Sequence, residues 1–167
     1  GIMEFVKSVK SLTNISKPNF VKIKINDLLA RVHTLMNPEF KDTEIQCELE
    51  LPVENFTIMG DLELLEQALI NLIKNAKEAF ESYSEVVDKK VILSAEKADG
   101  FSTIKVKDNG PGISRDQQED IFIPFFTTKK GGSGVGLALS RQIMRLHKGL
   151  LIISSEEGRG SVFSMRF

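Results

Sequence analysis

The fold of this chain is organised around residues 61–83, DLELLEQALINLIKNAKEAFESY, which predict one long amphipathic helix. Apolar residues recur in this stretch at alternating spacings of three and four, which places them on one stripe that faces a core. The stripe comprises Leu62, Leu65, Leu69, Leu72, Ala76 and Ala79. Asp61 directly precedes it and is well placed as the N-cap of the helix and for the helix dipole.

A column of uncharged amides runs along the same helix, because Gln67, Asn71 and Asn75 recur every four residues. Asparagine is a poor interior helix former, costing up to ~0.7 kcal/mol relative to alanine, so two asparagines in register need a reason. One reason is a solvated face. The other is a nucleotide site, because an amide oxygen can ligate Mg²⁺ and the amide nitrogen can donate to a phosphate oxygen.

The composition is that of one globular domain with an adequate core, since the 167 residues are 41% hydrophobic and 27% charged. The net charge of −1, with both signs interspersed, argues against a nucleic-acid or anionic-membrane surface. The lone Cys47 can form no intrachain disulfide and has no Cys or His nearby for a zinc site. No apolar run approaches the ~20 residues that cross a bilayer. We expect a cytoplasmic domain, whose longer parent can itself be membrane-anchored.

The rest of the chain alternates helix and strand signals on both sides of the central helix. Before it, we expect a helical remnant over 4–12 that a break over 14–18 ends. A strand over 20–25 and a helix from Asn26 to Pro38, which ends it, should follow. Two further strands are expected over 45–51 and 56–59. After it, we expect a hairpin of 91–98 and 101–107 around Asp99-Gly100, a helix from the capping-box residue Ser114 to about Ile121, a helix over 135–147 with Gly149 as C-cap, and a hairpin of 150–155 and 161–167.

Residues 108–112, Asp-Asn-Gly-Pro-Gly, directly follow one of these strands. Asn-Gly and Pro-Gly are typical of β-turns. A turn alone does not account for the sequel, because a helix follows where a hairpin requires a second strand. The alternative is a site for adenine, in which the Asp108 carboxylate accepts from the exocyclic amine and the bare glycine backbone lets the ring approach closely.

A glycine-rich run, Gly-Gly-Ser-Gly-Val-Gly at residues 131–136, leads into the last predicted helix. Glycines at alternate positions before a helix N-terminus can direct backbone N–H groups at phosphate. A flexible linker is the alternative. The run is neither the dinucleotide fingerprint G-x-G-x-x-G after a strand nor a Walker A loop, whose Gly-Lys-Ser/Thr ending it lacks.

Three phenylalanines, Phe122, Phe125 and Phe126, lie in residues 121–129, IFIPFFTTK, just before the glycine run. They fit a small hydrophobic cluster under a loop. They also fit the hinge of a lid that closes over nucleotide, with Lys129 or Lys130 near the phosphates. Residues 127–134 carry little apolar area to offset the ~1–2 kcal/mol per residue cost of ordering backbone, so we expect them to be mobile without nucleotide.

Taken in order, the segments NLIKNAKEA, DNGPGI, IFIPFFTTK and GGSGVGLAL resemble the N, G1, F and G2 boxes of bacterial sensor histidine kinases. This family shares the Bergerat ATP-binding fold of the GHKL superfamily with type II topoisomerases, mismatch-repair ATPases and the ninety-kilodalton heat-shock chaperone. The resemblance covers residues 20–167, and DNGPGI with PFFTTK is most similar to the nitrogen-regulatory subgroup. It implies an α/β (α+β) fold, a two-layer sandwich with a mixed, mainly antiparallel sheet and about three helices on one face.

The resemblance also implies roles for individual residues, with ATP and Mg²⁺ as cofactors. Asn75 matches the magnesium-ligating asparagine, Asn71 the first polar residue of the N box, and Asp108 the adenine-binding aspartate. Asn71 and Asn75 are therefore the implied catalytic residues. The implied nucleotide-binding set also includes Gly110, Gly112, Thr127, Lys129, Gly132, Gly134, Val135, Gly136 and Leu137.

Two features of the N box bear on its chemistry, and the first is a departure from the pattern of the kinases. Many of these kinases carry a phosphate-binding lysine three residues after the magnesium asparagine, where this chain has Glu78, so a phosphate contact is not assigned to Lys77. The ATPase relatives place a general-base glutamate where Asn71 stands, which argues against efficient hydrolysis by water.

Neither histidine is the expected phospho-acceptor. His33 opens an H-x-x-x-N-P spacing like that of the phospho-accepting box, but no acidic residue follows it and its helix lies too near the N box. His147 fits a residue that interacts with the dipole at a helix C-terminus. We expect the acceptor on a separate dimerisation domain, with residues 1–19 as the end of a dimerisation helix and a linker, and residues 20–167 as the catalytic ATP-binding domain.

The implied function is transfer of the γ-phosphoryl group of Mg-ATP to that histidine in two-component signal transduction, with the receiver domain of a response regulator as a further partner. We expect a homodimeric parent, a monomeric fragment and no nucleic-acid partner. Two alternatives stay open. An ATP-dependent conformational switch or ATPase of the topoisomerase and chaperone kind should carry glutamate at position 71, and a nucleotide-sensing regulator would bind ATP without catalysis.

Overall fold

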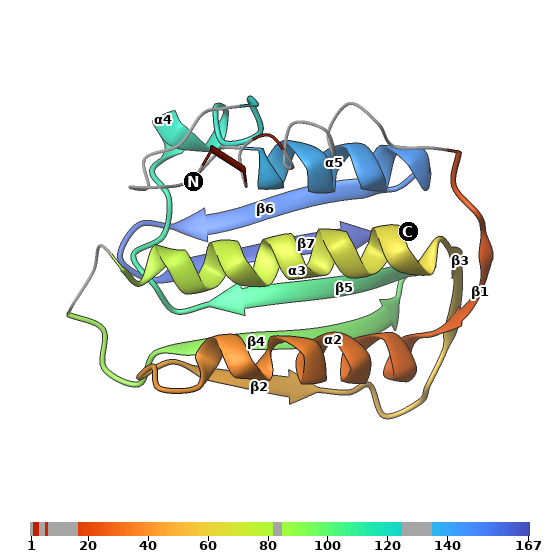
Figure 1. Cartoon of the computed structure of the whole chain (residues 1–167), viewed down its shortest axis with the longest axis horizontal. Helices are drawn as coiled ribbons and strands as arrows, with labels where there is room; N and C mark the ends of the chain where they lie inside the picture. Colours follow the sequence, from red (N-terminus) through yellow and green to blue (C-terminus); the bar gives the residue numbers. More distant parts are fainter. Residues whose placement is uncertain (1, 4–5, 7–16, 82–84, 125–134) are drawn as a thin grey trace.

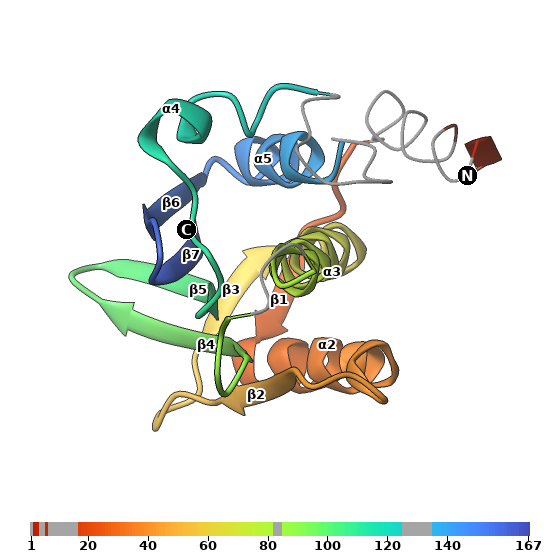
Figure 2. The same cartoon turned by 90° about the vertical axis from the view of Figure 1, so that its left-hand side faces the viewer.

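The computed structural model describes residues 2–3, 6, 17–81, 85–124 and 135–167. Helices α2 (Ile25–Phe40), α3 (Leu62–Ala79) and α5 (Gly136–Leu146) form one layer against a five-stranded sheet (Figure 1). Seen from the end, all three helices cover the same face of the sheet, and α3 lies between the other two (Figure 2). The predicted two-layer sandwich is confirmed.

The sheet has the strand order β2-β4-β5-β7-β6. Its strands are β2 (Gln46–Glu50), β4 (Lys90–Ala98), β5 (Phe101–Asp108), β7 (Gly160–Arg166) and β6 (Leu150–Glu156). Only the β2–β4 pair is parallel within this sheet, so the prediction of a mixed, mainly antiparallel sheet is confirmed. Strands β1 (Val21–Lys24) and β3 (Thr57–Gly60) pair with each other in a separate two-stranded sheet, which the sequence pattern did not indicate.

The core lies between α3 and the central strands. Helix α3 buries Leu65, Ala68, Leu69, Leu72, Ile73 and Ala76, while Leu62, which the stripe placed inward, is exposed. A helix that packs on a sheet and between two other helices buries a wider arc than one stripe. Alternate residues of the central strands meet this arc, and they include Val91, Leu93, Ile104, Val106, Phe163 and Met165.

Helix α3 begins as predicted, because the Asp61 Oδ1 atom accepts a hydrogen bond from the Leu64 N–H at 3.1 Å. It ends at Ala79, short of the predicted Tyr83, which lies outside the described residues. Helix α4 (Arg115–Gln118) begins at the predicted cap, where Ser114 Oγ accepts from the Gln117 N–H at 3.4 Å. It ends well before the predicted Ile121.

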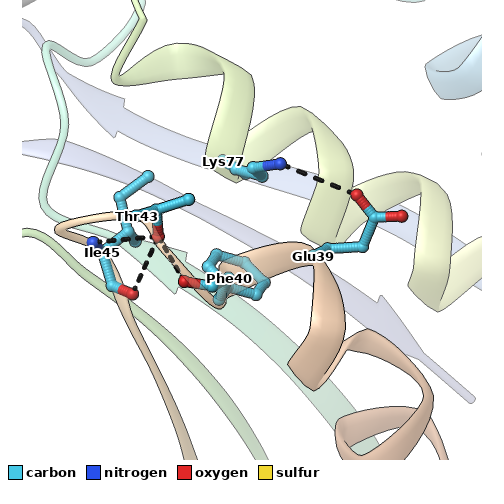
Figure 3. A network of polar contacts seen from close by, with 5 residues as sticks. All are labelled: Glu39, Phe40, Thr43, Ile45 and Lys77. Carbon is cyan, nitrogen blue, oxygen red and sulfur yellow. Dashed lines mark hydrogen bonds and ion pairs between the residues drawn. The ribbon is translucent and has the colours of Figure 1, made fainter.

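The prediction that Pro38 ends α2 was wrong, because the helix continues through it to Phe40. A proline in the last turn removes one N–H, and the turn is still closed by the Lys41 N–H on the Asn37 carbonyl at 3.2 Å. Thr43 Oγ1 then donates to the Phe40 carbonyl at 2.6 Å and accepts from the Ile45 N–H at 3.2 Å, which leads the chain into β2 (Figure 3).

The C-terminus of α5 differs from the prediction by one residue. The residue in the left-handed backbone conformation after the helix is Lys148, with φ of 57°, and not Gly149. The Lys148 N–H bonds to the Arg145 carbonyl and the Gly149 N–H to the Met144 carbonyl, which is the Schellman pattern. Glycine is needed at position 149 for space, because a Cβ there would collide with the Arg166 carbonyl of β7.

Both predicted hairpins are present. In the first, Asp99 and Gly100 have φ of 54° and 80°, as an Asp-Gly turn between twisted strands requires. In the second, β6 and β7 pair from Leu150↔Arg166 to Glu156↔Gly160. In the part of the chain that the structure describes, no helix has both the length and the apolar composition needed to cross a membrane.

Candidate functional site

Helices α3 and α5 run antiparallel, and three contacts fix their register. At one end, His147 Nε2 accepts the Asp61 N–H at 3.0 Å. In the middle, the buried Ser140 Oγ donates to the Ala68 carbonyl at 3.2 Å. At the other end, a Cβ on Gly136 would lie 3.8 Å from the Cβ and Cγ atoms of Asn71. The N-terminus of α5 therefore lies beside Asn71.

The Asn71 side chain presents a buried donor at this junction. Its Nδ2 atom is inaccessible to solvent and has no hydrogen-bond partner among the described residues. An unsatisfied buried donor costs roughly 1–3 kcal/mol, so an acceptor atom of a bound ligand would stabilise such a group. The first N–H groups of α5 also lack partners within their own helix and carry the positive end of its dipole. Together these donors suit an anion, phosphate above all.

Asn75 lies one turn beyond Asn71 on the same face of α3 and is half-buried. Its amide oxygen is the kind of hard ligand that Mg²⁺ takes together with phosphate oxygens and water. Asn71, the middle residue of the predicted amide column, lies beside the start of α5, and the solvated-face interpretation does not fit this residue.

Asp108 lies at the end of β5 and is 3% exposed. Its Oδ1 atom accepts a hydrogen bond from the Gly110 N–H at 2.9 Å. Gly110 in turn faces the end of α3, since a Cβ there would lie 3.5 Å from Phe80 Cε1 and 3.7 Å from Ala79 Cβ. From Asn71 to Ala79 is two helical turns, roughly 12 Å. The site thus runs along α3, with a buried carboxylate at one end and anion-binding donors at the other.

The loop after Asp108 packs on the β6–β7 hairpin. Gly112 has φ of 73°, and a Cβ there would collide with the Glu156 carbonyl. The Gly158 N–H donates to the Pro111 carbonyl at 2.7 Å, and the Ile113 N–H donates to Ser155 Oγ at 2.8 Å. The close approach that requires glycine at 112 is therefore to this hairpin. Contact of Gly112 with a nucleotide stays a prediction.

The remaining predicted site residues fall into two groups. Val135 is buried and Leu137 packs against the core, so only their backbone is available at the start of α5. Four of the predicted site residues lie outside the described residues, and so does the predicted lid over 127–134: Thr127, Lys129, Gly132 and Gly134.

Phe122 is half-buried against the core, and the Arg141 guanidinium carbon lies 5.1 Å from its ring centroid, as expected for an anchored aromatic residue.

Lys77 points away from α5. Its Nζ atom lies 3.6 Å from Glu39 Oε2 on α2, the helix on the other side of α3 (Figures 1 and 3). This position agrees with leaving Lys77 out of the phosphate-binding residues.

The two histidines make structural hydrogen bonds. His33 Nε2 lies 2.9 Å from the Cys47 carbonyl and ties α2 to β2. His147 Nδ1 lies 2.7 Å from the Ile143 carbonyl while Nε2 accepts the Asp61 N–H, a pair of bonds that the tautomer with its proton on Nδ1 makes. The Nδ1 contact is at the C-terminal end of α5, where an interaction of His147 with the helix dipole was expected, and the Nε2 bond in addition joins α5 to α3.

Burial raises the pKa of the Cys47 thiol from an ordinary 9.0 to about 11. At pH 8 the folded protein should therefore react with a disulfide reagent roughly 100-fold more slowly than the urea-unfolded chain. The rate should climb about tenfold per pH unit until pH approaches 11. Stopped-flow absorbance between pH 7 and pH 10.5 measures this profile, and a plateau already at pH 9 would contradict it.

Comparison with known proteins bears on the family and the fold of this chain. Residues 60–167 match the family model described as "Histidine kinase-, DNA gyrase B-, and HSP90-like ATPase". The signal transduction histidine-protein kinase AtoS of Escherichia coli K12 is 32% identical over 162 residues, which cover 95% of this chain and 26% of AtoS. The chain therefore spans about a quarter of the length of that relative.

Solved structures show the same fold. The nucleotide-free catalytic domain of the histidine kinase ThkA superposes with a TM-score of 0.75 at 29% identity, covering 89% of this chain and 95% of that one. ThkA in complex with the response regulator TrrA gives a TM-score of 0.79 at 26% identity, covering 99% of this chain and 46% of that one. The chain belongs to the histidine kinase-, DNA gyrase B- and HSP90-like ATPase family.

Proposed function

We propose that this domain binds Mg-ATP between α3 and α5 and transfers its γ-phosphoryl group to a histidine on a separate dimerisation domain. The observation that carries the proposal is the buried Asn71 Nδ2 donor, which has no partner among the described residues and lies beside Gly136 at the N-terminus of α5. The Asn71 amide supplies a donor where the phosphates of a nucleotide would lie. Two turns along α3, Asp108 supplies the acceptor for adenine.

Each group has a distinct role in this proposal. Asp108 accepts from the exocyclic amine of adenine, and the Asn71 amide and the N–H groups at the start of α5 hold phosphate oxygens. Asn75 is the protein ligand of Mg²⁺, which when bound neutralises charge on the phosphates. Asn71 has no carboxylate to activate water, so the site favours transfer to a positioned acceptor over hydrolysis.

The partners follow from the same proposal. The acceptor histidine belongs to a dimerisation domain that residues 1–19 join to the catalytic domain, and a response regulator receives the phosphoryl group from it. AtoS is named as a signal transduction histidine-protein kinase, and ThkA is seen with a response regulator, which supports this assignment. A homodimeric parent, a monomeric isolated domain and a cytoplasmic location for it complete the proposal.

A transfer assay tests the proposal. The domain is mixed with a separately purified histidine-containing dimerisation domain of such a kinase and ATP labelled at the γ-phosphate. We expect acid-labile label on the dimerisation domain. Asn75→Ala should lower the label at least 100-fold, since the magnesium ligand is lost while the helix gains propensity.

The exposed Asn37 on α2 offers a matched control, and Asn37→Ala should label normally. Free phosphate without labelled protein would indicate an ATPase instead. ATP binding with neither product would indicate a nucleotide-sensing regulator. Unchanged magnesium-dependent ATP affinity in Asn75→Ala would remove Asn75 from the site.

A further inference from the structure

We propose that Asn109 is a positioning residue of the nucleotide site, whose side-chain amide locks the end of β5 onto the start of β4 and so holds Asp108 in place. The proposal rests on the proposed function, because Asp108 is the residue that Asn109 positions. Asn109 itself would not touch the nucleotide.

Three hydrogen bonds join Asn109 to one short segment. Its Oδ1 atom accepts the Lys90 N–H at 2.7 Å, and its Nδ2 atom donates to the Asp88 carbonyl at 2.8 Å. Its backbone N–H donates to the Lys90 carbonyl at 3.3 Å. The regular β4–β5 ladder ends at the pair Val91↔Asp108, so these bonds extend it one residue beyond the carboxylate.

The chemistry of the side chain explains why asparagine stands here. Both the donor and the acceptor of its amide are used, and both partners are backbone groups. Aspartate would keep the acceptor but would place a second oxygen against the Asp88 carbonyl. Asn-Gly in a sequence usually indicates a turn with positive φ. Asn109 is not among the described residues with positive φ. The hydrogen bonds of its side chain, and not a left-handed backbone conformation, therefore explain why asparagine is present at this position.

The far end of the same loop is also fixed. Ser155 Oγ accepts the Ile113 N–H at 2.8 Å, and the Gly158 N–H holds the Pro111 carbonyl at 2.7 Å. Asp108 thus begins a short loop that is held on one side by β4 and on the other by the β6–β7 hairpin. A carboxylate held in this way is already oriented before a ligand arrives, which lowers the entropic cost of binding.

The test compares Asn109→Ala with Asn55→Ala. Asn55 is a matched control, because its Oδ1 atom accepts the Asn26 N–H at 3.0 Å in another part of the fold. Calorimetry gives the Kd for ATP and for GTP, and hydrogen exchange reports the Lys90 amide. We expect Asn109→Ala to raise the Kd for ATP about tenfold, to narrow the preference over GTP and to speed exchange at Lys90. Asn55→Ala should leave both Kd values within about twofold.

A second variant keeps the proposal testable if Asn109→Ala does not fold. Asn109→Asp retains the acceptor for the Lys90 N–H and should give an intermediate Kd for ATP. The proposal is overturned if the folded Asn109 variants bind ATP with the wild-type Kd and the wild-type preference over GTP. Wild-type protein that binds no ATP would instead reject the proposed function itself.

Discussion

Replacing Asp108 with asparagine is expected to weaken ATP binding by roughly 10- to 100-fold, the loss typical of a hydrogen bond to a charged group. The substitution keeps the shape of the side chain, and its Oδ1 atom can still accept the Gly110 N–H. What changes is the other oxygen, which becomes an NH₂ group. This NH₂ group cannot accept a hydrogen bond from the amine of adenine, but it can donate one to the carbonyl of guanine. The preference for ATP over GTP should therefore narrow.

Asp99→Asn is the matched control for this measurement. Asp99 occupies the turn at the opposite end of β5, and asparagine tolerates its φ of 54° as well as aspartate does. The same loss of one charge should leave both affinities unchanged. Equal binding of ATP and GTP by the wild-type protein would show that Asp108 does not read adenine.

Replacing Gly160 with alanine is expected to destabilise the fold by roughly 3–5 kcal/mol. Its φ of 115° lies where residues with a Cβ are strained, and the added methyl group would collide with the carbonyl of Asp108. That carbonyl belongs to a paired strand and cannot withdraw without opening the Asp108↔Ser161 pair between β5 and β7. Because the strand end that moves carries Asp108, ATP binding should be lost together with stability.

Gly158→Ala, in the same turn, tests backbone strain without the collision that Gly160→Ala adds. Gly158 has φ of 84°, but nothing lies within 4 Å of the Cβ that alanine would add. Its cost should be about 1 kcal/mol, from backbone strain alone. Urea unfolding of both variants measures the difference, and equal losses would show that the contact with Asp108 is not what fixes glycine at 160.

Much of the fold could be predicted from local patterns. The amide column, the Asp61 cap and the Asp-Gly hairpin each depend on residues close in sequence, and the structure has all three. Two local assignments were wrong, and the first of them was wrong because of a distant contact. Gly149 was assigned to a helix cap by its conformational freedom, whereas the structure needs it for its lack of a Cβ beside β7. Pro38 was expected to end α2, but the helix continues to Phe40, and the Lys41 N–H closes its last turn on the Asn37 carbonyl.

The order of four motifs along the chain indicated the family and, through the resemblance, the two-layer architecture and the candidate site residues. Hydrophobic period and turn chemistry predicted most helices and strands. How the candidate site residues lie relative to one another became visible only in the fold. The antiparallel packing of α5 on α3 places Gly136 against Asn71, whose buried Nδ2 atom has no partner in the part of the chain that the structure describes. The hydrogen bonds of Asn109 reach a segment some twenty residues earlier in the chain. Such contacts depend on where two distant backbones come to rest, which no local pattern specifies.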